Sequence, residues 1–260
     1  MKLKDLPIGT IVKDSNSKYN GKVMLWYVAE KYSNSFSDTH VTYPSNSVLL
    51  LSIDFLCQKP WNKGNWKKNY IIDSAIRPWL NRADLDSTYN ENGFLSYLSQ
   101  EFTNNLLNIS ISNRWGSIAS DRIILPSYAE MGIAHDFVGE GKRFSLLSQN
   151  LSLNRVNGYT LTRSDNDTDP GNITPNGTRQ FNGSTEASTV IRPICCLKED
   201  VDISIDTANG HYFLFKKGSN MQFKINGSKK LYSEGWVKVD GQKKVIASIK
   251  TKINGLLKDV

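Results

Sequence analysis

Residues 48–57 read VLLLSIDFLC, and this stretch fixes the centre of the expected fold. Its apolar residues run on with little polar alternation, which is typical of a strand buried on both faces. Residues 23–29 (VMLWYVA) form a second apolar run, and they follow Asn20-Gly21, a dipeptide that favours a two-residue hairpin turn. Residues 189–197 are a late strand candidate. We therefore expect a sheet with residues 48–57 in a central, buried place.

Two helices are predicted. Residues 74–81 form a short helix although Pro78 lies inside it, and Asn92 is a suitable N-cap for a longer one. In the longer helix the apolar residues recur every four positions and would face a core; they are Phe94, Leu98, Phe102 and Leu106. Strands and helices together predict the α+β class, with a mixed antiparallel sheet and two helices.

The sequence pattern changes after Leu197. Short alternating strands follow, separated by glycine-containing turns, at residues 203–205, 212–215, 222–225, 236–239 and 245–249. We therefore predict an α+β domain at residues 1–198 and a small antiparallel β module at residues 201–260. No long repeat is evident. A module of this size is marginally stable alone, so we expect it to pack on itself or on a partner.

The positive charge is concentrated near the C-terminal end. The chain has a formal net charge of +7, and residues 201–260 alone hold eleven lysines, no arginine and five acids, a net charge of +6. Such a module either offers a basic face to phosphate, teichoic acid or a membrane surface, or has a solvated lysine-rich exterior. Nucleic-acid binding is not expected, because arginine is the side chain that contacts bases and phosphates bidentately.

Membrane insertion and secretion are not expected either. The sequence has no apolar run of about 18 residues, and no apolar segment follows the basic residues at the start. The cysteines are Cys57, Cys195 and Cys196, and we expect buried free thiols made in a reducing cytoplasm. A disulfide between Cys57 and one of the adjacent pair stays open.

No metal or cofactor is predicted. Asp165, Asp167 and Asp169 resemble the start of a calcium loop, but an EF-hand needs Gly at its sixth position and Glu at its twelfth, where Pro170 and Asn176 stand. A looser calcium loop and a solvated acidic turn both stay open. The three histidines lack ligand spacing, and no nucleophile elbow or phosphate-binding loop occurs. We therefore assign no catalytic residues and expect a protein that is not an enzyme.

Aromatic and basic residues alternate in two predicted loops, at residues 60–70 and 114–116. Exposed Trp and Tyr rings stack on sugars or anchor protein interfaces, whereas buried rings fill a core. Both interpretations stay open for Trp61 and Trp66. With the polar segment at residues 164–188, these loops supply the candidate ligand-binding residues, which are Trp61, Trp66, Lys67, Tyr70, Arg114, Trp115, Asp165, Asp167 and Asn176.

Four other residues are predicted to be structural. Trp79 is expected in the core. Arg77, Arg163 and Arg192 each lie at the end of an apolar run. Arginine in such a place more often braces loops, through backbone carbonyls and acids, than it contacts a ligand.

An ordered set of motifs over about residues 1–198 resembles a known family. The set comprises Ile8-Gly9-Thr10, a Tyr-initiated motif at residues 70–81 that ends in IRPWLN, a Phe-rich helix at residues 94–107, the stretches at residues 121–130 and 158–164, and the closing IRPI at residues 191–194. This family is an uncharacterised domain of Clostridium-type bacteria and their phages. The chain departs from its pattern at Tyr159, where Trp is usual, and at Pro126.

The resemblance implies a protein encoded among phage tail genes, made in the bacterial cytoplasm and carried on the virion. It implies a tail or fibre component, in particular a receptor-binding adhesin. Such a protein would recognise a host cell-surface glycan or protein, contact other tail or baseplate proteins, and act as a homo-oligomer. The motif order also resembles the C-type-lectin-like fold.

Two other functions stay open. The first is a structural baseplate or tail connector, whose aromatic loops would contact other virion proteins. The second is an oxygenase related to formylglycine-generating proteins, which would need Cys195 and Cys196 open to a cleft and able to hold copper. Adjacent residues of a strand point to opposite faces, so that pair is not expected to act together.

Overall fold

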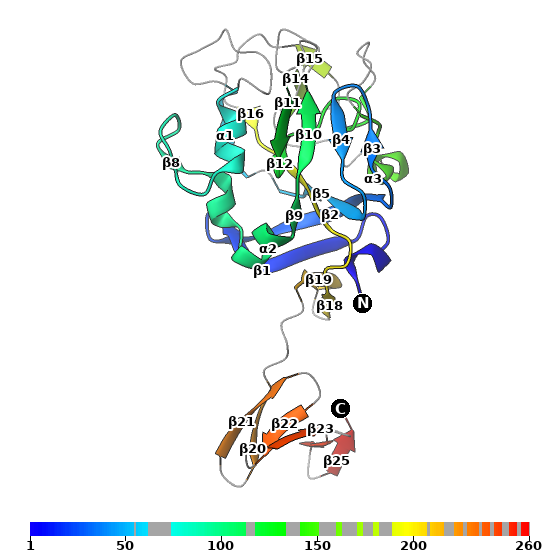
Figure 1. The fold of residues 1–260 in the computed structure, drawn as a ribbon, viewed down its shortest axis with the longest axis vertical. Coiled ribbons are helices and arrows are strands. Elements are labelled where there is room, and N and C mark those ends of the chain that lie inside the picture. The colour runs from blue at the N-terminus through cyan, green and yellow to red at the C-terminus, as the bar shows by residue number, and fades with distance from the viewer. Residues whose placement is uncertain are drawn as a thin grey trace. The chain divides into compact units, whose positions relative to one another are not determined.

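The computed structural model divides the chain into two compact units, which we call unit 1 (Met1–Phe215) and unit 2 (Lys216–Val260). Figure 1 shows the elements of both units. In unit 1 the structure describes residues 1–54, 56–61, 74–112, 118–133, 141–150, 189–206 and 209–215, and three further strands between 160 and 181. In unit 2 it describes six strands between residues 221 and 259.

Unit 1 is built on an eight-stranded sheet, counted over its described residues. The strand order is β12-β17-β5-β2-β1-β19-β18, and β9 also pairs with β17. The bounds are β1 (Ile11–Tyr19), β2 (Lys22–Tyr32), β5 (Ser47–Ser52), β9 (Leu106–Leu107), β12 (Ile123–Ile124), β17 (Ile194–Lys198), β18 (Ile203–Asp206) and β19 (His211–Leu214).

The predicted central strand is present but shorter than the apolar run. Every residue of β5 is buried, and β5 lies between β2 and β17 in the sheet, with Leu50 opposite Val28 on one side and Cys195 on the other. Burial on both faces explains why this stretch has no polar alternation. The strand ends at Ser52, and the chain then turns toward β6 (Gln58–Lys59).

The predicted hairpin between β1 and β2 is also present. Tyr19 pairs with Lys22, which leaves a two-residue turn of Asn20 and Gly21. Both turn residues have positive φ, 49° at Asn20 and 78° at Gly21. This is the turn type whose twist matches the two strands, and it explains why the dipeptide favours a hairpin here.

The first unit extends beyond the boundary that we predicted at residues 198–201. Strand β19 pairs in parallel with β1, with Val12 opposite Tyr212, and β18 pairs antiparallel with β19. Phe215 is buried and its ring contacts that of Phe102 at 6.0 Å. The two strands that we had placed in the C-terminal module therefore complete the edge of the central sheet of unit 1.

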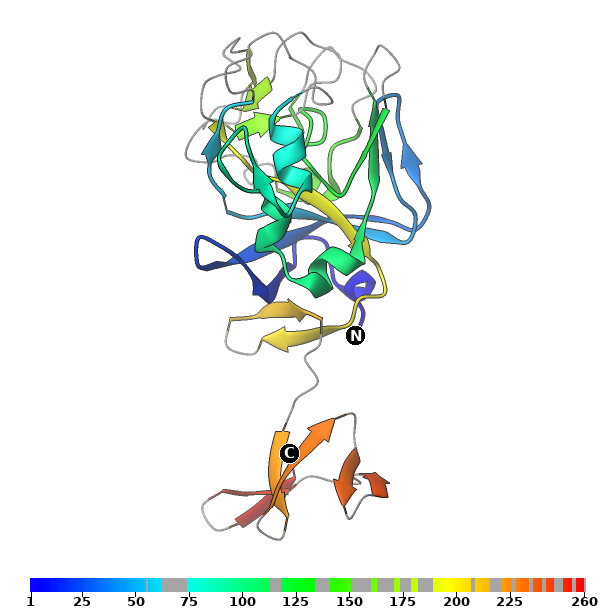
Figure 2. The same cartoon turned by 60° about the vertical axis from the view of Figure 1, so that its left-hand side comes forward.

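Smaller sheets cover the rest of unit 1. One has the order β11-β10-β4-β3 and another the order β15-β14-β13-β16-β6. The second lies at the end of the unit away from the β18–β19 hairpin (Figure 1, Figure 2). The bounds are β3 (Phe36–Ser37), β4 (Val41–Tyr43), β7 (Leu85–Asp86), β8 (Glu91–Asn92), β10 (Ile109–Ser112), β11 (Ile118–Asp121), β13 (Thr160–Thr162), β14 (Gly171–Ile173), β15 (Arg179–Phe181) and β16 (Thr189–Val190).

The predicted α+β, C-type-lectin-like fold with two helices is wrong. The described chain is mostly strand, and its α-helices are α1 (Ile76–Asn81), α2 (Gln100–Asn105) and α3 (Ser145–Gln149), of five or six residues each. The expected long helix after Asn92 is broken into a 3₁₀ helix (Phe94–Tyr97) and α2. Ser99 has extended backbone and its side chain accepts from the amide of Phe102, so it is an N-cap where we expected the middle of a helix.

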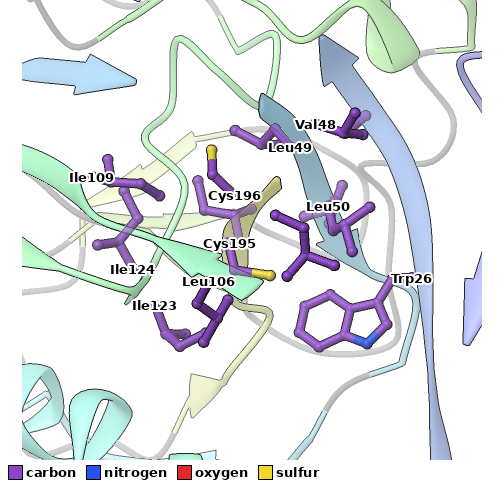
Figure 3. Packing of buried hydrophobic residues seen from close by; sticks show 14 of the residues in the cluster. Trp26, Val48, Leu49, Leu50, Leu106, Ile109, Ile123, Ile124, Cys195 and Cys196 are labelled. Carbon is purple, nitrogen blue, oxygen red and sulfur yellow. The ribbon is translucent and has the colours of Figure 1, made fainter. Parts of the chain in front are cut away.

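The core lies on both faces of β5 and β17. Figure 3 shows the sulfur of Cys195 on the side of Leu50 and Trp26, and the sulfur of Cys196 beside Leu49. All three cysteines are free, and Cys195 and Cys196 are fully buried. Burial raises the pKa of the Cys196 thiol to about 12. These thiols are packing groups, and the adjacent pair is not open to a cleft as the oxygenase hypothesis requires.

Unit 2 consists of three hairpins in its described part. Strands β20 to β23 form one sheet in sequence order, and β24 and β25 form a separate pair. The bounds are β20 (Met221–Ile225), β21 (Ser228–Ser233), β22 (Trp236–Val239), β23 (Gln242–Val245), β24 (Lys250–Ile253) and β25 (Leu256–Asp259).

Candidate functional site

A pocket of about 320 Å³ lies beside the β1–β2 hairpin, between β2 and the chain that follows β5. Its exposed rim is polar and carries one cation and one carboxylate, from Lys22 and Asp54, with Asn20 at the turn. Its floor is buried and formed by Tyr19, Met24, Ser52 and Leu56. An apolar floor with a few polar groups around it is the usual composition of a small-molecule site.

Arg192 holds the wall of this pocket in place. Its side chain is 2% exposed, and its Nε donates to the carbonyl oxygen of Ser52 at 2.7 Å. Burial lowers the pKa of the guanidinium to about 10, while the charge of Asp54 raises it. The side-chain hydroxyl of Ser52 in turn donates to the carbonyl of Asp54 at 2.8 Å. Arg192 therefore braces the turn that places Asp54 on the rim.

Tyr19 connects the pocket to a second cluster underneath it. Its hydroxyl lies close to the thiol of Cys57, and burial raises the pKa of both groups. Its ring contacts Tyr97 edge-on at 4.7 Å between centroids and Phe94 at 6.3 Å. The Tyr19 ring in the floor of the pocket is thus held from below by three side chains from two segments, Cys57 and the 3₁₀ helix that contains Phe94 and Tyr97.

Lys59 is a buried cation within that cluster. Its side-chain nitrogen lies 2.6 Å from Oε1 of Glu91, 4.5 Å from the ring centroid of Trp79 and 4.7 Å from that of Tyr89. Tyr89 donates its hydroxyl to the carbonyl of Pro60 at 2.7 Å. A desolvated ammonium over two rings gains a cation–π attraction in addition to the ion pair. The arrangement ties β6 to α1 and β8 and makes Trp79 part of the core.

Arg77 pairs with Asp121 on the opposite side of α1. Nε and a terminal nitrogen of Arg77 donate to the two carboxylate oxygens at 2.7 and 3.0 Å. Burial raises the pKa of Asp121, and Arg77 opposes that rise. One helical turn on, the Asn81 side chain donates to the carbonyl of Ile123 and accepts from the amides of Arg122 and Ile123. These bonds fasten α1 to β11 and β12.

The predicted ligand-binding residues are only partly placed. The side chain of Trp61 is 1% exposed, and the Trp61 carbonyl accepts from the amide of Ile76, so this ring fills the core and does not face a ligand. Trp79 is fully buried, and Arg192 is 2% exposed. The other candidates lie outside the residues that the structure describes, namely Trp66, Lys67, Tyr70, Arg114, Trp115, Asp165, Asp167 and Asn176, and so does Arg163.

The sequence interpretation missed two buried carboxylates. Glu130 is fully buried; it accepts from the hydroxyl of Tyr43 and, at 2.8 Å, from the amide of Ser127. The Ser127 hydroxyl accepts from the amide of Glu130 in return, which is the capping-box pattern Ser-x-x-Glu, readable from the sequence. Glu30 accepts from the amide and hydroxyl of Ser145 at 2.9 and 2.6 Å and so caps α3.

Searches for two other kinds of site give negative results within the described ranges. No group of three or more His, Cys, Asp or Glu side chains there could hold a metal ion. No helix among those residues is long and apolar enough to cross a membrane.

These features define a class: a mostly β protein with a mixed central sheet, a polar-rimmed pocket at one hairpin, and a second, lysine-rich β unit. Residues 45–199, more than half of the chain, match the family described as "Domain of unknown function (DUF6273)", and the chain belongs to that family. Comparisons with curated proteins and with solved structures give no match.

Proposed function

We propose that this protein is a non-enzymatic host-attachment component of a phage tail or fibre, and that the pocket beside the β1–β2 hairpin binds one unit of a host-surface glycan. The observation that carries the glycan part is the composition of the pocket. A sugar offers hydroxyls on its rim and C–H groups on its faces, so it fits a polar rim around a mainly apolar floor that includes the ring of Tyr19.

The size and exposure of the pocket support a weak, single-unit site. About 320 Å³ lies at the lower end of the range for ligand pockets. Asn20, Lys22 and Asp54 are exposed and can exchange bound water for sugar hydroxyls. A weak site of this kind gains strength when several copies act together, which agrees with the homo-oligomer that the family resemblance implies.

The assignment to a virion rests on the ordered motifs of unit 1 that resemble phage tail-associated proteins, including residues 76–81 and 191–194. In the fold these two motifs are braces: Arg77 bonds Asp121, and Arg192 bonds Ser52. They support the scaffold that holds the pocket, so family members would keep the scaffold while the rim varies with the host.

Adsorption competition tests the proposal. Purified full chain is added to host cells before phage, and the variant Lys22→Gln/Asp54→Asn is compared with Lys198→Gln/Asp200→Asn, which makes the same charge changes at exposed positions that do not line the pocket. We expect wild type and control to compete equally and the pocket variant about tenfold less, since a hydrogen bond to a charged group contributes roughly 1.5–3 kcal/mol. No competition by the wild type would rule out the adhesin, and full competition by the pocket variant would rule out the pocket.

A structural connector is the second candidate, favoured by two observations. Trp61 is in the core, and β18 lies at the edge of the central sheet with Ile205 56% exposed. An edge strand with an exposed apolar side chain pairs readily with another chain. Cross-linking of intact particles distinguishes the candidates, because a connector predicts cross-links from β18 to another virion protein and no competition for the host surface.

A further inference from the structure

Unit 2 contains a 14-residue repeat that becomes evident when its hairpins are aligned. Residues 223–232 read FKINGSKKLY, residues 237–246 read VKVDGQKKVI, and residues 251–260 read TKINGLLKDV. The second, fifth and eighth positions are Lys, Gly and Lys in all three copies, and the fourth is Asn or Asp.

The strand register repeats with the sequence. Lys224 lies opposite Lys229 in the first hairpin, and Lys238 lies opposite Lys243 in the second. In the third hairpin the equivalent partners are Lys252 and Leu257. Each copy is therefore the same structural unit, with a two-residue Asn-Gly or Asp-Gly connection.

The two lysine pairs occupy one face of the four-stranded sheet. Ser233 pairs with Trp236 across β21 and β22, so these two positions share a face. Lys229 is four residues before Ser233, and Lys238 is two residues after Trp236, and in a strand every second position returns to the same face. The register thus places one lysine position on each of four adjacent strands, in a staggered row: position 238 falls opposite position 231, two residues from Lys229.

This row carries an electrostatic cost in the absence of an anion. Like charges directly opposite on neighbouring strands are destabilising, yet the pair occurs at the same place in two copies. Residues 216–260 hold eleven lysines, no arginine and three acids, a net charge of +8, whereas residues 1–215 hold 21 basic and 22 acidic residues, a net charge of −1. The excess positive charge of the protein therefore belongs to unit 2.

We propose that this lysine face binds an extended polyol-phosphate polymer, the chemistry of a wall teichoic acid. Neighbouring strands lie about 4.8 Å apart, so these four strands offer a staggered series of lysine positions, two directly opposed pairs offset by two residues, to a chain of repeated phosphates. Lysine is a compact point charge that does not require planar, bidentate geometry. This favours a flexible phosphodiester chain over a nucleic acid, whose recognition relies on arginine. The inference does not depend on the glycan pocket of unit 1.

The test titrates the full chain with poly(glycerol phosphate) at several salt concentrations. The variant Lys229→Gln/Lys238→Gln/Lys243→Gln removes three charges from the face. The matched control, Lys230→Gln/Lys244→Gln/Lys258→Gln, removes three charges at equivalent repeat positions on the opposite face of the hairpins. Both variants are first shown to be folded by circular dichroism and thermal unfolding.

We expect the face variant to bind roughly 10- to 50-fold more weakly near physiological salt. Its plot of log affinity against log salt should be shallower by about 2, because the variant loses three lysines and each phosphate contact releases about 0.7 of a counterion from a flexible chain. The control should change affinity less than about threefold.

Three results would overturn the proposal. Equal losses in the two variants would mean that net charge alone attracts the polymer. Tighter binding to duplex DNA or to anionic phospholipid vesicles than to poly(glycerol phosphate) would assign the face to another ligand. Absence of binding by the wild type at low salt would exclude the site altogether. A failure here leaves the adsorption test of unit 1 unaffected, because that test changes only Lys22 and Asp54.

Discussion

Unit 1 and unit 2 reach a β fold by opposite means. In unit 1 the central sheet includes pairings between distant parts of the chain, and these pairings are not repeated. One of them joins β1 to β19, with Val12 opposite Tyr212. In unit 2 every described hairpin is local, and its register is copied from one hairpin to the next. Unit 1 has a large shared core, whereas unit 2 gains its structure from a short sequence used three times.

The difference predicts different responses to mutation. In a domain with one core, a change at a central contact affects the whole cooperative unit. In a repeat structure, stability is close to a sum over units and their neighbours, so equivalent changes should have equivalent effects. Unfolding of the full chain should therefore show two transitions that respond to different substitutions.

The largest expected effect is that of Phe102→Ala. Phe102 is fully buried, and its ring contacts Trp26 at 5.6 Å and Phe215 at 6.0 Å, which joins α2, β2 and the end of unit 1. We expect the free energy of unfolding of unit 1 to fall by about 3–5 kcal/mol, with the unit 2 transition unchanged. Urea unfolding followed by near-UV circular dichroism measures this. Ile118→Ala, at a position 73% exposed, is the control and should change stability by less than about 0.5 kcal/mol.

Tyr43→Phe is expected to have the next largest effect. The hydroxyl of Tyr43 donates to the buried carboxylate of Glu130, and its removal leaves that charge with one donor fewer. A hydrogen bond to a charged group contributes roughly 1.5–3 kcal/mol, and we expect a loss of that size in unit 1. Tyr212→Phe, at a partly exposed ring on β19, serves as the matched control. If Tyr43→Phe and Tyr212→Phe both unfold at the same urea concentration as the wild type, the hydrogen bond between Tyr43 and Glu130 does not stabilise unit 1.

The repeat in unit 2 is tested by Gly227→Ala and Gly241→Ala. Each glycine is the second residue of a two-residue connection, and such turns favour positive φ at that position. Alanine there costs roughly 1–2 kcal/mol. We expect the two variants to lower the unit 2 transition by equal amounts and to leave unit 1 unchanged. Clearly unequal effects would mean that the hairpins are not equivalent units.

The sequence predicts what is determined locally or by burial on both faces. Asn20-Gly21 predicts its hairpin because positive φ is a property of those two residues. The four apolar residues from Val48 to Leu51 predict β5 because no polar residue interrupts them. The helix expected after Asn92 is interrupted at Leu98 and Ser99, which have extended backbone, and it ends at Asn105 because Leu106 pairs with Leu197 in the sheet. That partner is 91 residues away in the chain, and the four-residue spacing of apolar side chains contains no trace of it.

The candidate site was less predictable for the same reason. Trp61 lies in a segment rich in aromatic and basic residues, which is typical of a binding loop. Only the packing of the chain shows that its ring is buried in the core. Of the pocket residues, Lys22 begins β2 and Asp54 lies in the turn after β5, and β2–β5 pairing brings the two together. Neither has a distinctive neighbour in the sequence. The Ser127-x-x-Glu130 pattern is an exception, because a capping box is local and was readable.

The smallest predicted effect is a pH dependence at Asp121, and it tests whether burial or pairing dominates at the edge of unit 1. Burial raises the pKa of Asp121, and Arg77 only opposes that rise. A carboxyl with a raised folded-state pKa stabilises the fold below its unfolded pKa of about 4 and loses that contribution as pH rises through the folded value. Asp121→Asn cannot ionise, so the stability of wild type minus that of the variant should fall as the pH rises above the unfolded-state pKa of about 4. Urea unfolding at each pH measures the difference, and a rise instead would show that the Arg77 ion pair outweighs the cost of burying the charge.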